Sequence, residues 1–245
     1  NQFYVFSVGL NKPNNQGCYY TLVDMSLNGG LGAVVAQNIK INNQKSGDCI
    51  QAIKHGNGRD WWIINKYASP NAPNHYNRFF VYLVTPDSIY PPTTTDFNDA
   101  TDADFQKMVF NSDGTKFMNF NAAGYMSEFN FNRCTGNISL YKNILVEQVL
   151  PSDLFFWEGA YSPNDSVFYV STLWWPNLPN EYLLQYDLSD SNIAASCDTI
   201  EIFQNPIDCG ALRLAPDGKI YFARAFDYGF PGYPYPDSVH NFVNQ

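Results

Sequence analysis

The sequence predicts an all-β protein built from many short antiparallel strands. Three observations support this: abundant aromatic residues, abundant turn formers, and a turn sequence that recurs along the chain. Aromatic residues make up 17% of the 245 residues and charged residues only 15%, and aromatic side chains suit the pleated, half-buried surface of a strand. The chain also contains 16 Gly and 15 Pro, which are typical of tight turns.

One turn sequence recurs about every fifty residues. The octapeptides at 110–117 (FNSDGTKF), 161–168 (YSPNDSVF) and 214–221 (LAPDGKIY) share its pattern, and 53–60 (IKHGNGRD) takes the same place in an earlier repeat. Asp or Asn caps such a turn, and Gly accepts the positive φ that reverses the chain. Each turn lies between apolar segments, so each one predicts a β-hairpin.

The segments between these turns predict three complete four-stranded units and two partial ones, because aromatic or β-branched runs end at turn residues. The partial unit at 1–41 has expected strands at 3–10, 18–25 and 33–41. The unit at 49–96 has them at 49–55, 61–67, 79–85 and 87–90. The unit at 105–149 has them at 105–111, 116–121, 125–132 and 138–149. The unit at 154–204 has them at 154–161, 167–173, 182–188 and 198–204. The partial unit at 209–225 has them at 210–214 and 219–225, before an irregular tail at 226–245.

Four-stranded units of about 40 to 50 residues are typical of β-propeller blades. We therefore predict a single β-propeller portion, and expect it to belong to a six- or seven-bladed ring because the chain holds only three complete units. Two alternatives remain open. The two partial units could join into one blade and close a four-bladed ring, or the strands could form a pair of β-sandwiches.

Charge and cysteine content narrow the functional class. The net charge is −9 and the 14 Lys and Arg are scattered, which argues against a nucleic-acid partner. The apolar runs are too short to predict a membrane span. Low Lys content, high Asn content and aromatic richness suggest an extracellular protein, a location that would permit disulfides among the five Cys. Cys197 and Cys209 are candidates for one bridge, and each could equally be a buried free thiol.

Several stretches resemble one known family. They are YTLVDMSLNGGL at 20–31, HGNGRDWW at 55–62, FNRCTG at 131–136, LQYDL at 184–188 and GALRLAPDGKIY at 210–221. Together they resemble the WD40-like β-propeller of large secreted surface proteins from gliding bacteria with type IX secretion, over about 18 to 223. The resemblance implies a secreted, cell-surface protein with further domains in the same polypeptide. It transfers no catalytic residues.

The same resemblance implies O-glycosylation, because these bacteria modify a short Asp-Ser/Thr-apolar sequon on exported proteins. The candidate acceptors are Ser88, Ser166, Thr199 and Ser238. The pattern is short, and Asp-Ser also suits any turn.

The longest predicted loops carry the candidate ligand-binding residues. Trp174 and Trp175 lie in a Pro-rich connection between the second and third strands of a unit, and His75 and Tyr76 lie in the equivalent connection of another. Alternation of strand direction places both loops on one face, with the segment 91–104. Aromatic side chains on loops form platforms for sugars and proteins. This face is the predicted contact for a protein or glycan partner, unless the Trp174 loop folds back onto its own blade.

The segment 91–104 also offers a calcium candidate. Asp96, Asp99, Asp102 and Asp104 could hold Ca²⁺ together with backbone carbonyls. The segment lacks the glycine and terminal glutamate of an EF-hand loop, so a solvated acidic loop is the favoured interpretation. No other metal or cofactor is expected.

No catalytic motif is recognisable, and we expect His55 to brace its turn beside Arg59 and Asp60. The favoured function is a non-catalytic scaffold or a recognition and adhesion surface. One alternative is a propeller enzyme, a polysaccharide hydrolase or lyase with acidic residues near the central channel. Another is a subunit of a surface filament or secretion assembly. Carboxylates, His or a metal at the channel mouth would favour the enzyme, and apolar and Asn residues the scaffold.

Overall fold

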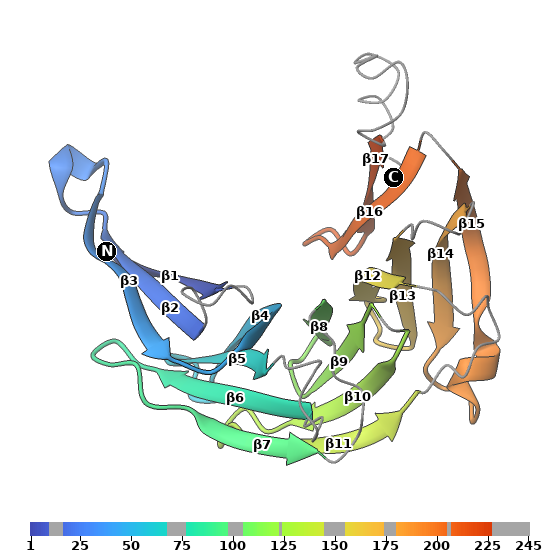
Figure 1. Cartoon of the computed structure of the whole chain (residues 1–245), viewed down its shortest axis with the longest axis horizontal. Coiled ribbons are helices and arrows are strands. Elements are labelled where there is room, and N and C mark those ends of the chain that lie inside the picture. Colours follow the sequence, from blue (N-terminus) through green and yellow to red (C-terminus); the bar gives the residue numbers. More distant parts are fainter. Residues whose placement is uncertain are drawn as a thin grey trace. The chain divides into compact units, whose positions relative to one another are not determined.

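The computed structural model describes residues 1–9, 17–67, 77–97, 105–122, 124–144, 155–173, 180–204 and 207–226. Within them the chain forms antiparallel sheets of sequence-consecutive strands, three of which have four strands each (Figure 1). The chain therefore has the predicted all-β propeller fold. It divides into two compact units, which are described separately: unit 1 is Asn1–Phe105 with Arg133–Asn137, and unit 2 is Gln106–Asn132 with Ile138–Gln245.

Unit 1 contains two sheets. The first has the strands β1 (Gln2–Gly9), β2 (Gly17–Asp24) and β3 (Ala33–Asn42), with a short 3-10 helix, η1 (Asn28–Gly30), before β3. The second has β4 (Ser46–Lys54), β5 (Trp61–Tyr67), β6 (Asn77–Val84) and β7 (Thr93–Phe97). β1 contacts β4. The two sheets share a core of Cys18, Ile63, Phe80, Tyr82 and Val84.

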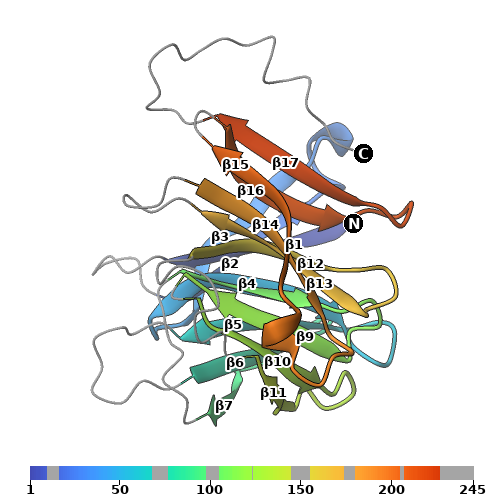
Figure 2. The same ribbon diagram turned by 90° about the vertical axis from the view of Figure 1, so that its right-hand side faces the viewer.

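Unit 2 contains two four-stranded sheets and one hairpin. The first sheet has β8 (Gln106–Phe110), β9 (Lys116–Asn121), β10 (Met126–Phe131) and β11 (Ile138–Asn143). The second has β12 (Phe155–Tyr161), β13 (Val167–Leu173), β14 (Asn180–Asp187) and β15 (Asp198–Gln204), with η2 (Ile193–Ser196) before β15. The strands β16 (Ile207–Leu214) and β17 (Ile220–Phe226) form the hairpin, drawn in red in Figure 2.

The sheets of unit 2 pack side by side in chain order, and their first strands are neighbours. β12, the first strand of its sheet, contacts both β8 and β16, the first strands of the neighbouring sheet and of the hairpin. In Figure 1 these three strands lie on one side of unit 2, and β11 and β15 lie on the other. Aromatic and aliphatic side chains fill the space between the four-stranded sheets; the buried ones include Met118, Phe120, Phe156, Phe168 and Tyr186.

The expected strands match the observed ones closely, with one clear error. The segment 87–90 was expected as the fourth strand of its unit, but that strand is β7, at Thr93–Phe97. Residues 85–88 form a turn, in which the Thr85 N–H donates to the Ser88 carbonyl. Pro91 and Pro92 follow, and they have no N–H to donate to a ladder. Before the prolines, the segment makes only an isolated bridge from Ile89 to Val84, and the continuous ladder with β6 begins at Thr93, opposite Val81.

The recurring octapeptide forms the same turn each time. The fourth turn residue donates its N–H to the carbonyl of the first: Gly58 to His55, Gly114 to Asn111, Asp165 to Ser162 and Gly218 to Ala215. Three of these donors are glycines with positive φ, as the sequence pattern predicts. The fourth, Asp165, has a φ of 57°, a conformation that a residue with a side chain rarely adopts.

The Asp165 side chain accounts for its presence at this position. Its carboxylate accepts hydrogen bonds from the Ser112 N–H (3.0 Å) and the Ser112 hydroxyl (2.6 Å), in the equivalent turn of the neighbouring sheet. The Asn111 amide adds a third, at 3.4 Å. Glycine would fit the backbone better but could not join the two turns. Asp165 therefore ties the sheet β8–β11 to the sheet β12–β15.

The cysteines do not form the predicted bridge. Cys197 packs against the core cluster that contains Tyr186, whereas Cys209 lies in a separate cluster with Leu212 and Phe222. Both thiols are free, and burial raises the pKa of each. Among the described residues, no helix is long and apolar enough to cross a membrane.

Substitution of Asp165 tests its role as a tie between sheets. Asp165→Ala keeps the unfavourable φ and loses the hydrogen bonds, so we expect the free energy of unfolding to fall by about 2 kcal/mol. Asp165→Gly loses the same bonds but relieves the backbone, and should lose about half as much. Urea denaturation measures both. Equal stability of the Ala variant and the wild type would contradict the tie.

Candidate functional site

Several predicted site residues lie outside the described residues. These are Trp174, Trp175, His75, Tyr76, Asp99, Asp102, Asp104 and Ser238. Their binding, calcium and glycosylation roles therefore stay predictions.

The structure does describe one residue of the calcium candidate and three of the candidate glycosylation acceptors. Asp96 forms a bidentate ion pair with Arg78 at 2.6 and 2.7 Å, and the guanidinium lowers the pKa of this carboxyl. Both of its oxygens thus already face a cation. Ser88 and Thr199 are exposed, whereas Ser166 is half-buried and donates its hydroxyl to Asn164 at 2.9 Å. Within the described ranges no group of three or more His, Cys, Asp or Glu is placed to hold a metal ion.

His55 braces its turn, as expected. Its Nδ1 accepts the Asn57 N–H at 2.9 Å, and its ring stacks on Trp62 at 5.1 Å between centroids. Asp60 accepts hydrogen bonds from Arg59 and from the Asn57 amide, and these bonds lower the pKa of its carboxyl. The side chains of this turn are committed to one another, which leaves no proton-transfer pair there.

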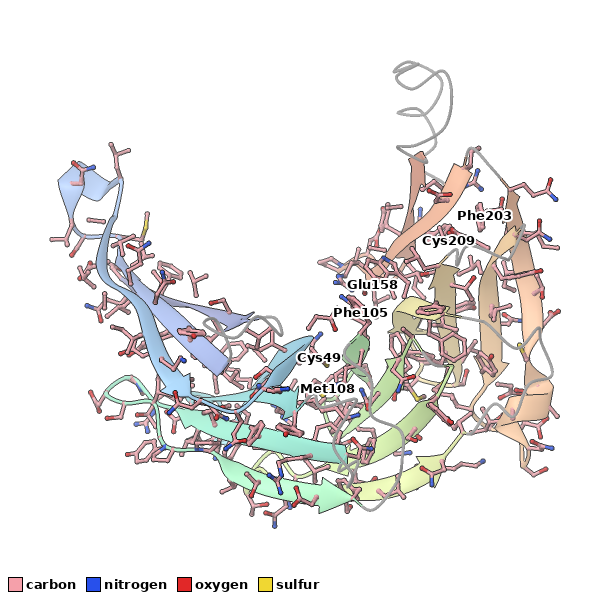
Figure 3. The ribbon with its side chains drawn as sticks, in the orientation of Figure 1. Cys49, Phe105, Met108, Glu158, Phe203 and Cys209 are labelled. Atoms are coloured by element: carbon pink, nitrogen blue, oxygen red, sulfur yellow. The ribbon has the colours of Figure 1, made fainter. Side chains whose placement is uncertain are left out.

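The candidate site of unit 2 is a charged cluster on the first strands of neighbouring sheets. Lys107 lies on β8, Glu158 on β12 and Arg213 on β16. Figure 3 labels Glu158 on β12, on the side of its sheet away from β15. Because β12 contacts both β8 and β16, three segments far apart in the sequence bring their charges to one point. We call these three residues the β12 charge cluster.

The geometry of the β12 charge cluster places the carboxylate between the cations. Glu158 Oε1 lies 3.3 Å from Lys107 Nζ, and Glu158 Oε2 lies 2.9 Å from Arg213 Nη1. The Glu158 side chain is 10% exposed, whereas that of Arg213 is 66% exposed. Lys107 Nζ also lies 5.3 Å from the centroid of the Trp157 ring. The cluster thus has one well-shielded carboxylate and one guanidinium that solvent or a ligand reaches.

A β-bulge sets the direction of Glu158. The register of β12 against β13 shifts between Phe156 and Glu158, so Trp157 has no direct partner. A bulge of this kind re-aims a side chain and is common beside active sites. The Glu158 N–H donates to the Ser171 hydroxyl at 3.3 Å, and that hydroxyl donates to the Gly210 carbonyl at 2.9 Å. Ser171 therefore fixes the Glu158 backbone relative to β16.

Two other buried carboxylates of unit 2 serve the core. Glu128 Oε1 accepts a hydrogen bond from the Tyr161 hydroxyl at 3.0 Å, and Glu128 Oε2 lies 3.7 Å from Lys116 Nζ. Burial together with the Glu128 charge raises the Tyr161 pKa. Glu181 accepts the backbone N–H of Cys209. Each of these carboxylates satisfies a buried donor, whereas Glu158 pairs with a cation that is itself mostly exposed.

The β12 charge cluster was not predicted from the sequence. The signal that could have found it is one glutamate in the run FFWEGAY at 155–161, where its neighbours are apolar or small. A charge in such a strand needs partners, since an unpaired buried carboxylate costs several kcal/mol. The partners come from segments 50 or more residues away, so the sequence alone could not name them.

The comparisons with known proteins support the fold. No protein-family model and no curated protein matches the chain. A Bifidobacterium bifidum protein assigned as an exo-β-1,3-galactanase has 9% identity and a TM-score of 0.54, covering 90% of this chain and 77% of its own. The exo-β-1,3-galactanase of Phanerochaete chrysosporium, solved with β-1,3-galactotriose, has 8% identity and a TM-score of 0.52, covering 91% and 53%. The Swd1 β-propeller domain of Myceliophteria thermophila has 8% identity and a TM-score of 0.45, covering 84% and 60%.

These comparisons correct the main functional prediction. The sequence favoured a non-catalytic scaffold or recognition module, but the two structures just described with TM-scores above 0.5 are galactanases. The prediction of a non-catalytic module is therefore wrong. The findings support its alternative, a propeller enzyme, better than the main prediction.

The stabilities of a single and a double variant test whether the β12 charge cluster is needed to hold the sheets together. Lys107→Met leaves Glu158 with only the exposed Arg213, so we expect the free energy of unfolding to fall by roughly 1–2 kcal/mol. Lys107→Met combined with Glu158→Met removes the carboxylate as well, and should return to within about 1 kcal/mol of the wild type. Urea denaturation measures both. A double variant less stable than the single one would mean that the cluster chiefly holds the sheets together.

Proposed function

We propose that the chain is part of a β-propeller enzyme that cleaves a polysaccharide at the β12 charge cluster. The observation that carries the proposal is the convergence of Lys107, Glu158 and Arg213 on neighbouring first strands, with the carboxylate in the middle. The likeness of fold to two galactanases suggests galactan as the first substrate class to examine.

Each residue has a distinct role in this proposal. The ion pairs require the ionised form of Glu158, which is the form that accepts a proton or attacks as a nucleophile. Glycoside hydrolysis uses two carboxyl groups. Glu158 supplies the basic one, and the acid that gives its proton to the leaving oxygen comes from a second carboxyl group outside the β12 charge cluster. Arg213, mostly exposed, binds sugar hydroxyls, and Lys107 holds the carboxylate in place from the opposite side.

A second reaction class has its own support. Elimination from a uronate-containing polysaccharide needs one base and a cation that neutralises the sugar carboxylate. Glu158 and the exposed guanidinium of Arg213, 2.9 Å apart, provide that pair. A lyase leaves an unsaturated sugar that absorbs ultraviolet light, whereas a hydrolase leaves only new reducing ends.

We also propose that the enzyme acts outside the cell. The family resemblance to secreted surface propellers of gliding bacteria supports this location, as does the composition. Association with type IX secretion and glycosylation at Ser88, Ser166 and Thr199 belong to the same proposal. Mass spectrometry of the protein purified from its source tests both the location and the modification.

Glu158→Gln tests the catalytic proposal. The amide keeps the shape of the side chain but neither accepts a proton nor attacks, so we expect cleavage to fall by about 100-fold or more. The substrates are β-1,3-galactan and a uronate-containing polysaccharide, followed by reducing-end release and by ultraviolet absorbance. Circular dichroism checks that the variant folds.

Glu128→Gln is the matched control, because Glu128 is also buried, ion-paired and in unit 2. It should retain activity to within about threefold, since a lost buried interaction lowers stability rather than transition-state binding. Equal loss of activity in the two variants, or none in either, would overturn the role of Glu158. Cleavage of neither substrate by the wild type would overturn the proposed function.

A further inference from the structure

Unit 1 contains a cavity that the reaction at Glu158 does not use. Its volume is about 950 Å³, within the range of small-molecule sites. It lies between the two sheets of unit 1, at the end of the sheets where β1 begins and β2 ends. Its walls come from β1, β4 and β5, and its rim comes from the turns that follow β2, β4 and β6.

Aromatic rings dominate the walls of this cavity. Phe3, Tyr4 and Phe6 contribute from β1, and Trp61 contributes from β5. Trp61 is 44% exposed and Phe3 is 59% exposed, although both are large apolar side chains. The buried Ile63 and the exposed Ala52 add apolar surface to the lining. Exposed aromatic rings beside a cavity provide flat faces on which a ligand ring can stack.

The rim of the cavity adds one carboxylate and one guanidinium, each held in place by hydrogen bonds. The Asp24 carboxylate accepts the Ser26 N–H at 2.9 Å, the Ser26 hydroxyl at 2.6 Å and the Gln2 amide at 3.1 Å. These bonds, the Ser26 ones foremost, lower the Asp24 pKa to about 2. Arg59 is held by a bidentate pair with Asp60, at 2.8 and 3.2 Å. The rim therefore presents an acceptor and a donor in defined positions.

The charges at the rim limit the chemistry of the ligand. Asp60 neutralises Arg59, and the charges that remain near the aromatic walls are the Asp24 carboxylate and the Lys54 ammonium, whose Nζ lies 6.0 Å from the centroid of the Trp61 ring. These two charges have opposite signs, so neither an anionic nor a cationic ligand meets a net opposite charge there, and a neutral ligand is favoured. A purely apolar ligand would contact the aromatic walls but none of the polar groups at the rim. A neutral sugar satisfies both parts of the site, with ring faces against the aromatic walls and hydroxyls at the rim.

We propose that this cavity binds a neutral saccharide, with Trp61 as the stacking platform and Asp24 and Arg59 as hydroxyl partners. The site lies wholly in unit 1 and does not depend on Glu158. It would hold a polysaccharide chain at a second point, apart from the residues that cleave it.

The test is calorimetric binding to the Glu158→Gln variant, so that no sugar is consumed. The probes are neutral trisaccharides of galactose, glucose or mannose units. We expect at least one to bind, and Trp61→Ala to weaken that binding at least about tenfold, which corresponds to about 1.4 kcal/mol. Asp24→Asn keeps the shape of the side chain but removes its charge, and should weaken binding about threefold or more.

Tyr90→Ala is the matched control, because Tyr90 is an exposed aromatic residue of unit 1 that does not line the cavity. It should bind as the parent does. Binding to none of the probes, or binding that Trp61→Ala leaves unchanged, would overturn the proposal. Binding of an apolar dye or peptide in place of every sugar would make the cavity an apolar docking site, and would overturn it equally.

Activity on short and long substrates distinguishes a failure of this binding site from a failure of the proposed catalytic site. Trp61→Ala in the otherwise wild-type chain should cleave short soluble substrates at the parent rate and lose activity only on long chains. Loss of activity on both would place Trp61 in the catalytic machinery, against the proposal.

Discussion

Close packing of aromatic side chains between sheets is the constraint on which unit 2 depends. Phe120 and Phe168 meet edge to face at 5.6 Å between ring centroids, one from each four-stranded sheet. A Cβ at Gly159 would lie 2.6 Å from Phe168 and 3.0 Å from Phe120. The chain tolerates only a glycine there. The sheet β12–β15 packs into core clusters on both faces, which is consistent with a composition in which aromatic residues exceed charged ones.

This packing makes the position of Glu158 informative. A carboxylate one residue before Gly159 must leave the aromatic core, and the β-bulge at Phe156 and Glu158 turns it away. Apolar residues of similar size often replace buried ion pairs without loss of stability. The requirement for a stable core therefore does not explain three charges at this point. The catalytic role that we propose would account for them, because a shielded carboxylate next to an accessible guanidinium is suited to proton transfer and charge stabilisation.

The sequence predicted repeating features well and singular ones poorly. The octapeptide turn is local, since its hydrogen bonds join residues three apart, and so its pattern located most hairpins correctly. The predicted position of the fourth strand in the 49–96 unit was wrong because Ile89 makes only an isolated bridge to Val84, and Pro91 and Pro92 delay the continuous ladder to Thr93. The β12 charge cluster was invisible for a different reason. It depends on which strands become neighbours, and no local pattern encodes that.

The pair Trp61-Trp62 shows what strand alternation can and cannot predict about the burial of neighbouring side chains. Adjacent strand residues point to opposite faces, so the sequence requires the two indoles to have different surroundings. It cannot say which one is buried. The fold decides: the Trp62 indole donates to the Arg133 carbonyl at 2.7 Å within unit 1 and lies under Gly136. Trp61 is thereby directed to the opposite face, where the sheets of unit 1 leave a cavity beside it. The exposure of Trp61 is thus a consequence of how Trp62 is anchored.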